Sequence, residues 1–241
     1  RMDSSKFALV TGAARRVGKA IALHLAQMGF DIGIHYGHSE EEAAQTRREI
    51  EAIGRTAELY SADLQDPEAI EKMFSEITKK RQAIDVLVNS AAIMPRSDLL
   101  QIGWQEWDHM LNVNLRAPWL VSVQAARLMR NGGVILNISD AGAGLHWTGY
   151  GAYAISKQGL NELTCLLAKQ LAPKIRVCGI APGLLLKPEE MPEEEWEKLS
   201  AKVPMQSAGD MASLLATIDL LITNGYITGE TITLNGGASL G

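Results

Sequence analysis

The chain has 241 residues, of which 46% are hydrophobic and 21% are charged, a composition typical of folded globular proteins that excludes intrinsic disorder. The formal net charge of −5 argues against nucleic acid or an anionic membrane surface as a partner. No apolar run approaches the roughly 20 residues that a membrane-spanning helix needs.

Cysteine and histidine usage narrows the class of protein further. Cys165 and Cys178 are too few and too far apart for a disulfide framework or a structural zinc site. The five histidines show no spacing typical of metal ligands, so we predict no metal. The polar stretch at residues 1–6 lacks the pattern of a signal peptide, and we expect a cytoplasmic protein.

Short apolar runs alternate with amphipathic segments along the whole chain. The expected strands lie at residues 7–10, 30–36, 56–61, 86–88, 134–139, 175–180 and 231–234. The expected helices lie at residues 17–28, 39–53, 67–77, 107–129, 153–171 and 211–222. The spacing of Ser39 and Glu42 predicts a capping box at the start of the second helix.

This alternation predicts one α/β domain over residues 1–241, a doubly wound parallel sheet of seven strands with helices on both faces. No linker rich in Pro, Gly or Ser divides the chain. The strongest interruption is the acidic segment 184–203, which contains Trp196. We interpret this segment as an excursion of the chain over the functional site.

The turn after the first strand contains Gly12, Arg16, Val17 and Gly18. Glycine permits a tight turn there, and the N-terminus of the next helix can then bind a pyrophosphate. A plain strand-to-helix connection also favours glycine, so the two glycines alone are a weak signal. The position after the first strand of a doubly wound pattern favours a dinucleotide site.

The end of the second strand indicates which dinucleotide is bound. NAD sites usually place an acid about 20 residues after the glycine turn, to hold a ribose hydroxyl. Here the strand ends in His35 and Tyr36, followed by Ser39, with no acid before Glu40. Together with Arg16 these donors suit a phosphate, so we predict NADP(H). Ser39 could instead only cap its helix.

Tyr153 and Lys157 are four residues apart and therefore lie on one face of a helix. The pair opens the helix after the fifth strand, at the sheet edge where open α/β folds bind ligands. A tyrosine can protonate the heteroatom during reduction of C=O or C=N. Lowering its pKa from about 10 to near 7 needs about 4 kcal/mol, which we expect Lys157 to supply in large part.

The chain resembles the short-chain dehydrogenases/reductases over nearly its whole length. The order and spacing of Thr11-Gly12, Asp63-Leu64, Asn89-Ser90-Ala91, Asn114, Tyr153 with Lys157, and Pro182-Gly183 carry the resemblance. It implies a Rossmann-type sheet, Tyr153 as the acid, Lys157 on the nicotinamide ribose, and Asn114 supporting a relay water. It also implies Asp63 near the adenine, Asn89 lining the cofactor cleft, and a homotetramer.

One position departs from that family in an informative way. Most members carry serine where this chain has Asp140, and alternation along residues 134–139 argues against Ser139 as a substitute. With Arg16, the 35–39 stretch and residues 191–204, Asp140 makes the chain similar to the pteridine reductases. That resemblance implies dihydropterin or dihydrofolate as substrate, with Asp140 binding it or assisting Tyr153.

Other positions break this second resemblance. Met94 stands where pteridine reductases have an aromatic ring, and Ala92 and Leu185 stand where they have hydroxyl groups. The alternatives are therefore a carbonyl reductase acting on a 3-oxoacyl thioester or a quinone, and a non-catalytic NADP(H) sensor. Retention of both Tyr153 and Lys157 argues against the sensor.

The expected site comprises three overlapping groups of residues. The catalytic residues are Tyr153, Lys157, Asp140 and Asn114. The cofactor-binding residues are Gly12, Arg16, Val17, Gly18, His35, Tyr36, Ser39, Asp63, Leu64, Asn89, Ser90, Ala91, Ser139, Tyr153, Lys157, Pro182, Gly183 and Leu184. The substrate-binding residues are Arg16, Met94, Asp140, Tyr153, Leu185 and Trp196.

Overall fold

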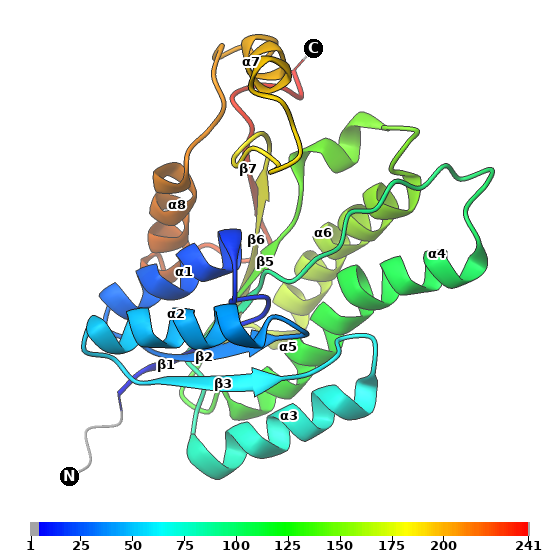
Figure 1. Ribbon diagram of the computed structural model, residues 1–241. Coiled ribbons are helices and arrows are strands. Elements are labelled where there is room, and N and C mark those ends of the chain that lie inside the picture. The colour runs from blue at the N-terminus through cyan, green and yellow to red at the C-terminus, as the bar shows by residue number, and fades with distance from the viewer. Residues whose placement is uncertain (1–4, 241) are drawn as a thin grey trace.

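A computed structural model describes residues 5–240. Residues 1–4 and 241 lie outside this range, and residues 1–4 are most of the stretch that we predict not to be a signal peptide. Seven parallel strands form one sheet in the order β3-β2-β1-β4-β5-β6-β7 (Figure 1). The strands are β1 (Phe7–Val10), β2 (Asp31–Tyr36), β3 (Ala57–Ser61), β4 (Val86–Asn89), β5 (Gly133–Ile138), β6 (Ile175–Pro182) and β7 (Thr231–Leu234). The predicted doubly wound sheet of seven strands is confirmed.

Eight α-helices among the described residues accompany the sheet. They are α1 (Arg16–Gln27), α2 (Glu40–Ala52), α3 (Pro67–Lys80), α4 (Trp104–Leu111), α5 (Ala117–Leu128), α6 (Gly151–Leu171), α7 (Glu193–Ala201) and α8 (Met211–Thr223). None of the helices within residues 5–240 is long and apolar enough to cross a membrane.

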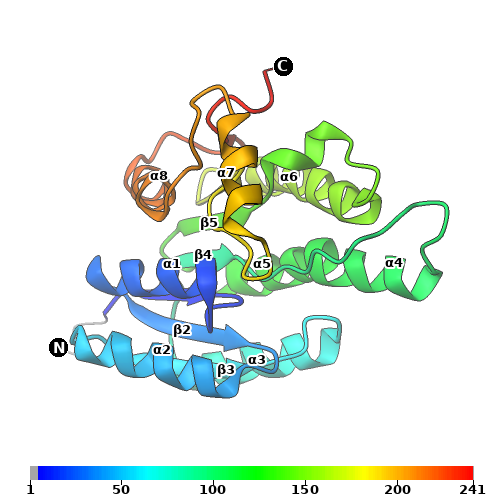
Figure 2. The same cartoon turned by 45° about the horizontal axis from the view of Figure 1, so that its top comes forward.

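Two apolar layers enclose the sheet (Figures 1 and 2). One layer joins α1, α2 and α8 to side chains such as Ala8 and Val10, and the other joins α3, α5 and α6 to Phe7 and Leu9. Alternate residues of β1 therefore face opposite layers, because successive side chains of a strand point to opposite sides. This packing explains why the central strands β1 and β4 are mostly apolar.

Three local expectations need correction. The expected helix at residues 107–129 begins earlier and contains a π-helical turn, η1 (Asn112–Arg116), which lets Pro118 fall in the first turn of α5. Ser39 makes no capping bond, because its backbone is not in the extended conformation that capping favours. Segment 184–203 contains the unpredicted α7, whose acidic first turn and Lys198 in the last suit the helix dipole.

Candidate active site

The carboxyl ends of the strands bring the predicted site residues to one edge of the sheet. Strand order reverses between β1 and β4, which defines the crevice where ligands bind in open α/β sheets. Gly12 follows β1 with φ +65°, and a Cβ there would lie 2.9 Å from the Cα of Ala91. A Cβ on Gly18 would lie 2.1 Å from the Gly12 carbonyl oxygen. Only glycine fits at both positions of this turn.

The start of α1 suits a pyrophosphate. Its N-cap residue, Arg15, makes no side-chain capping bond, and the first turn contains no acidic residue. The first N–H groups of this helix therefore keep their hydrogen-bonding capacity and their positive dipole end. These features fit a bound dinucleotide.

Arg16 adopts φ +50°, a left-handed conformation that non-glycine residues rarely take. Glycine would adopt this conformation without strain. Its Nη2 donates to the carbonyl of Lys187 at 3.4 Å, and its Nη1 lies 3.7 Å from the Glu189 carboxylate. Arg16 therefore joins the glycine turn to segment 184–203.

His35 has a role that differs from the predicted phosphate contact. The ring is buried, and its Nδ1 accepts a hydrogen bond from the Gly12 N–H at 3.1 Å. Its Nε2 therefore carries the proton and donates to the Ala62 carbonyl at 3.0 Å. Burial lowers the pKa of His35 to about 4, so the ring is neutral. His35 holds the glycine turn in place and has no ring nitrogen left for a ligand.

The remaining predicted adenosine-side residues surround this turn. Tyr36 and Ser39 are half-buried after β2, and the Ser39 hydroxyl is not used in capping. Asp63 is exposed after β3, where its Oδ1 accepts from the Gln65 N–H at 2.9 Å, and Leu64 next to it is buried. These positions are compatible with an adenosine site.

Thr11 belongs to the Thr11-Gly12 motif but was not among the expected site residues. Its hydroxyl oxygen accepts from the N–H groups of Ser90 at 3.0 Å and Ala91 at 3.1 Å. It thereby ties the ends of β1 and β4 together across the crevice. A polar residue at the end of an otherwise apolar buried strand was the available signal.

Asn89 does not line the cleft with its side chain. Its Nδ2 donates to Ser122 Oγ at 3.0 Å and to Asn137 Oδ1 at 2.8 Å. Asn137 in turn donates to Thr164 Oγ1 at 2.9 Å. The buried amide therefore belongs to a polar network beneath the site that links β4, β5, α5 and α6, because buried polar groups need partners.

The end of β6 closes the other side of the crevice. The Gly183 N–H donates to the Leu234 carbonyl, and the Leu184 carbonyl accepts from the Gly209 N–H, both at 2.8 Å. Pro182 is half-buried at the last position of the strand. Ser139, at the end of β5, donates its hydroxyl to the Lys157 carbonyl at 3.3 Å.

Tyr153, Asp140 and Lys157 converge where β5 meets α6. The Tyr153 hydroxyl donates to Asp140 Oδ2 at 2.6 Å, and the Gly142 N–H donates to Oδ1 at 2.6 Å. Lys157 donates from Nζ to the Ile138 carbonyl at 2.8 Å and lies 5.8 Å from the centre of the Tyr153 ring. The structure thus brings together three of the four residues predicted to be catalytic.

The expected pKa shift of Tyr153 is reversed. Burial, the charge of Asp140 and the hydrogen bond to Asp140 raise the pKa of the phenol above its ordinary value. Burial lowers the pKa of Lys157 to about 8, partly offset by Asp140. The lysine ammonium, directed at Ile138, does not counteract the nearby carboxylate, so Tyr153 remains a protonated acid in the unliganded protein.

Asn114 uses its side chain to hold a neighbouring segment. Its Oδ1 accepts from the Ile93 N–H at 2.9 Å, and its Nδ2 donates to the Ile93 carbonyl at 2.8 Å and to Ser156 Oγ at 3.1 Å. Asn114 lies in the π-helical turn η1, a feature frequent at functional sites. Its side chain is thus committed to positioning the loop after β4.

Three of the predicted substrate-binding residues lie outside the hydrogen-bonded cluster of Tyr153, Asp140 and Lys157. Met94 is 43% exposed on the loop after β4, and Leu185 packs partly against the core near β6. Trp196 is half-buried on α7, and no hydrogen bond or aromatic contact within residues 5–240 joins its ring to Asp140 or Tyr153.

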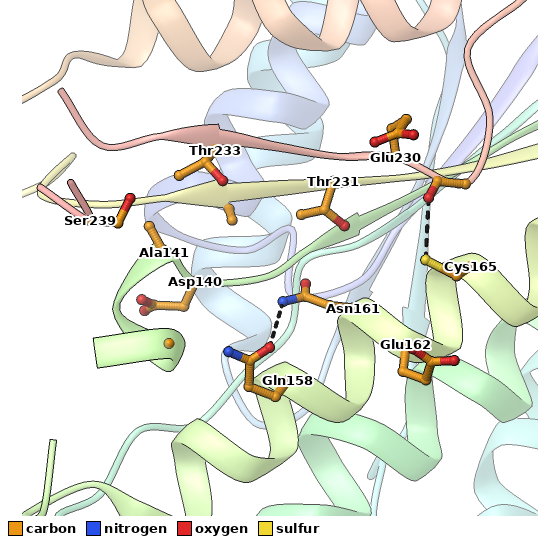
Figure 3. Close-up of a pocket in the computed structure, with 13 residues that line it drawn as sticks. Asp140, Ala141, Gln158, Asn161, Glu162, Cys165, Glu230, Thr231, Thr233 and Ser239 are labelled. Carbon is orange, nitrogen blue, oxygen red and sulfur yellow. Dashed lines mark hydrogen bonds between the residues drawn. The ribbon is translucent and has the colours of Figure 1, made fainter. Parts of the chain in front are cut away.

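A pocket of about 440 Å³ lies beside Asp140, between η2 (Ala141–Leu145), α6 and β7 (Figure 3). Asp140 and Ala141 form one edge, and Gln158 and Asn161 face Thr231 across it (Figure 3). This pocket lies on the β7 side of α6, so it is separate from the crevice between β1 and β4.

Comparison with known proteins agrees with this geometry. The family model described as Enoyl-(Acyl carrier protein) reductase matches residues 12–239. A 3-oxoacyl-(acyl-carrier-protein) reductase, FabG of Staphylococcus aureus, is 32% identical over 98% of this chain and 99% of its own length. The chain is an NAD(P)-dependent oxidoreductase, and it belongs to the short-chain dehydrogenase/reductase family.

Two solved structures of different enzymes are similar to this chain over nearly its whole length. FolM alternative dihydrofolate reductase 1 from Brucella canis, complexed with NADP, superposes with a TM-score of 0.93 at 31% identity, covering 100% of this chain and 96% of that one. Acetoin dehydrogenase YohF from Salmonella typhimurium superposes with a TM-score of 0.87 at 29% identity, covering 98% and 96%.

Proposed function

We propose that this enzyme reduces pteridines, dihydropterin or dihydrofolate, to their tetrahydro forms with NADPH. The observation that carries the proposal is the 2.6 Å hydrogen bond between Tyr153 and the Asp140 carboxylate. The likeness to FolM alternative dihydrofolate reductase supports it. Fully oxidised pterins are a further candidate substrate.

The chemistry of Asp140 favours a nitrogen heterocycle. A carboxylate accepts hydrogen bonds from N–H groups, which a pteridine offers and a simple ketone lacks. A serine hydroxyl, by contrast, donates to a carbonyl oxygen. Asp140 therefore orients an N–H-rich substrate beside the Tyr153 phenol.

Reduction of a C=N bond needs one hydride and one proton. NADPH supplies the hydride when bound. Tyr153 gives its proton to the substrate nitrogen, and the Asp140 carboxylate, which accepts the Tyr153 hydrogen bond, takes up a proton from solvent and passes it to Tyr153. Lys157, bound to the Ile138 carbonyl, keeps positive charge beside the phenol as its negative charge develops.

We propose NADP(H) as the preferred cofactor, with Arg16 and the Ser39 hydroxyl on its extra phosphate. Replacing Arg16 by alanine should lower the ratio of kcat/KM for NADPH over NADH by about tenfold or more, the effect of losing one charge-assisted hydrogen bond. Initial rates with both cofactors measure this ratio.

Arg130→Ala is the matched control, because Arg130 is an exposed arginine just before β5, at the amino end of the strands and away from the glycine turn. It should leave the ratio close to that of the wild type. A wild-type preference for NADH, or equal effects of both variants, would contradict the assignment of Arg16 and NADPH.

A substrate screen tests the proposed reaction. NADPH oxidation, followed by absorbance, should be fastest with dihydrobiopterin or dihydrofolate and slower with acetoacetyl thioesters, a small quinone and diacetyl. Turnover of an acyl thioester alone would overturn the pteridine proposal in favour of the second candidate.

The second candidate is a carbonyl reductase acting on a 3-oxoacyl thioester or a quinone. The apolar residues Met94, Ala92 and Leu185 favour it, as does the likeness to FabG. A non-catalytic NADP(H) sensor has less support, because Tyr153 and Lys157 are assembled beside Asp140. NADPH binding without turnover of any substrate in the screen would favour the sensor.

We propose that the enzyme is a cytoplasmic homotetramer. An apolar pocket of about 310 Å³ lies between the η1 region and α6, lined by Leu115, Trp119 and Leu163 among others. Trp119 and Leu166 remain 46% and 54% exposed nearby, and a second copy would cover them. The particle mass in solution, from light scattering, tests this assembly.

A further inference from the structure

The helix that carries Tyr153 lacks a capping residue of its own. Tyr150 occupies the N-cap position of α6, its side chain makes no capping bond, and the first turn contains no acidic residue. The first N–H groups of a helix have no partner within the helix and need one elsewhere. In α6 the partner comes from a distant part of the chain.

Ser97, on the loop between β4 and α4, makes three hydrogen bonds with this helix start. Its hydroxyl oxygen accepts from the Ala152 N–H at 3.2 Å, and its carbonyl accepts from the Gly151 N–H at 3.1 Å. Its own N–H donates to the Gly149 carbonyl at 2.8 Å. Ser97 is only 3% exposed, and Tyr153 is the next residue of α6 after this pair of N–H groups.

Two neighbours of Ser97 strengthen the same junction. The Arg96 guanidinium lies 5.6 Å from the centre of the Tyr150 ring, within the range of a cation–π contact. Leu99 packs directly on Gly151, where any Cβ would lie 2.4 Å from the leucine Cγ. The loop therefore contacts the start of α6 over several residues.

The other end of this segment is also held by the active site, since Asn114 binds both backbone groups of Ile93. Segment 93–97 carries the exposed Met94. It is hydrogen-bonded to η1 through Ile93 and to the start of α6 through Ser97. Loss of the hydrogen bonds at Ile93 or at Ser97 would therefore change the position of Tyr153 relative to this segment.

We propose that Ser97 is a positioning residue for proton transfer: its hydroxyl caps α6 from the loop after β4 and so sets the place of the Tyr153 phenol. The proposal rests on Tyr153 as the proton donor but not on pteridine as the substrate. It therefore applies to whichever substrate the wild type turns over.

The test uses Ser97→Ala, which removes the hydroxyl and keeps both backbone hydrogen bonds. The kcat should fall about tenfold, because a small misplacement of a catalytic group slows the chemical step. The Kd for NADPH, from protein fluorescence, should stay unchanged. The solvent deuterium isotope effect on kcat should rise as proton transfer becomes slower.

Two further variants separate positioning from stability. Asp210→Ala removes a comparable N-cap from α8, where Asp210 accepts from the Ser213 N–H at 2.8 Å, away from the β5–α6 junction. It should lower Tm about as much as Ser97→Ala while leaving kcat unchanged. Ser97→Thr keeps a hydroxyl and should restore most of the kcat.

Hydrogen exchange provides a readout that needs no substrate. In Ser97→Ala without ligands, amide exchange at residues 150–157 should be faster than in the wild type, with exchange in α8 unchanged. Unaltered exchange at the start of α6 would overturn the proposal, as would equal losses of kcat in Ser97→Ala and Asp210→Ala. Failure of the pteridine substrates alone would count only against the proposed reaction.

Discussion

Replacing Tyr153 by phenylalanine should lower kcat by about 10³-fold with every substrate that the enzyme reduces, the middle of the range of about 10²- to 10⁴-fold for loss of a general acid. The phenol is the group that hydrogen-bonds Asp140 at 2.6 Å, and its raised pKa keeps it protonated. Phenylalanine preserves the buried ring and removes only the proton donor. Single-turnover oxidation of NADPH measures the chemical step directly.

NADPH binding serves as the control for this variant. The Kd for NADPH and the Tm should change little, since the Tyr153 ring still fills its place against Met110 and Ala152 in the small apolar cluster at the start of α6. A kcat within a few-fold of the wild type would mean that another group supplies the proton. A large loss of NADPH affinity would instead indicate a structural role.

The second large effect is expected from Asp140→Asn. The amide keeps the shape of the carboxylate and an oxygen that can accept from the Gly142 N–H, but it loses the charge and the acceptor facing Tyr153. We expect kcat/KM for a dihydropterin to fall about 10²-fold or more, because a charged hydrogen bond to the substrate and the path for reprotonation are both lost.

The pH dependence of kcat should also shift in Asp140→Asn, in a direction that the pKa shifts at the site predict. Lys157 must stay charged to keep positive charge beside the phenol, so activity is present below its pKa and is lost as pH rises through it. Burial lowers that pKa to about 8, and the charge of Asp140 partly offsets the lowering. Asp140→Asn removes this offset while burial remains, so the alkaline limb of kcat should move to lower pH in this variant than in the wild type.

Asp140→Ser distinguishes the two candidate substrates. Serine is the usual family residue here, and it should abolish most pteridine reduction while retaining or improving reduction of an acetoacetyl thioester. Undiminished dihydropterin reduction in Asp140→Asn and Asp140→Ser would remove the main support for a pteridine reductase.

The sequence by itself determined the architecture and the shared helix face of Tyr153 and Lys157. Apolar runs separated by amphipathic segments predict the seven parallel strands, because the central strands are buried on both faces and most helices on one. The four-residue spacing of Tyr153 and Lys157 places them on one helix face whatever the rest of the fold does. These are local patterns, and the structure confirms the fold that they predict.

Only the tertiary structure decided how the polar groups are partnered. His35 looked like a phosphate ligand from its place near the end of β2, yet its ring nitrogens bind Gly12 and Ala62. Tyr153 was expected to have a lowered pKa, yet the bond to Asp140 and burial raise it. Hydrogen bonds between distant elements, like that of Ser97 to α6, depend on the distance and direction at which packed elements meet, which no local periodicity encodes.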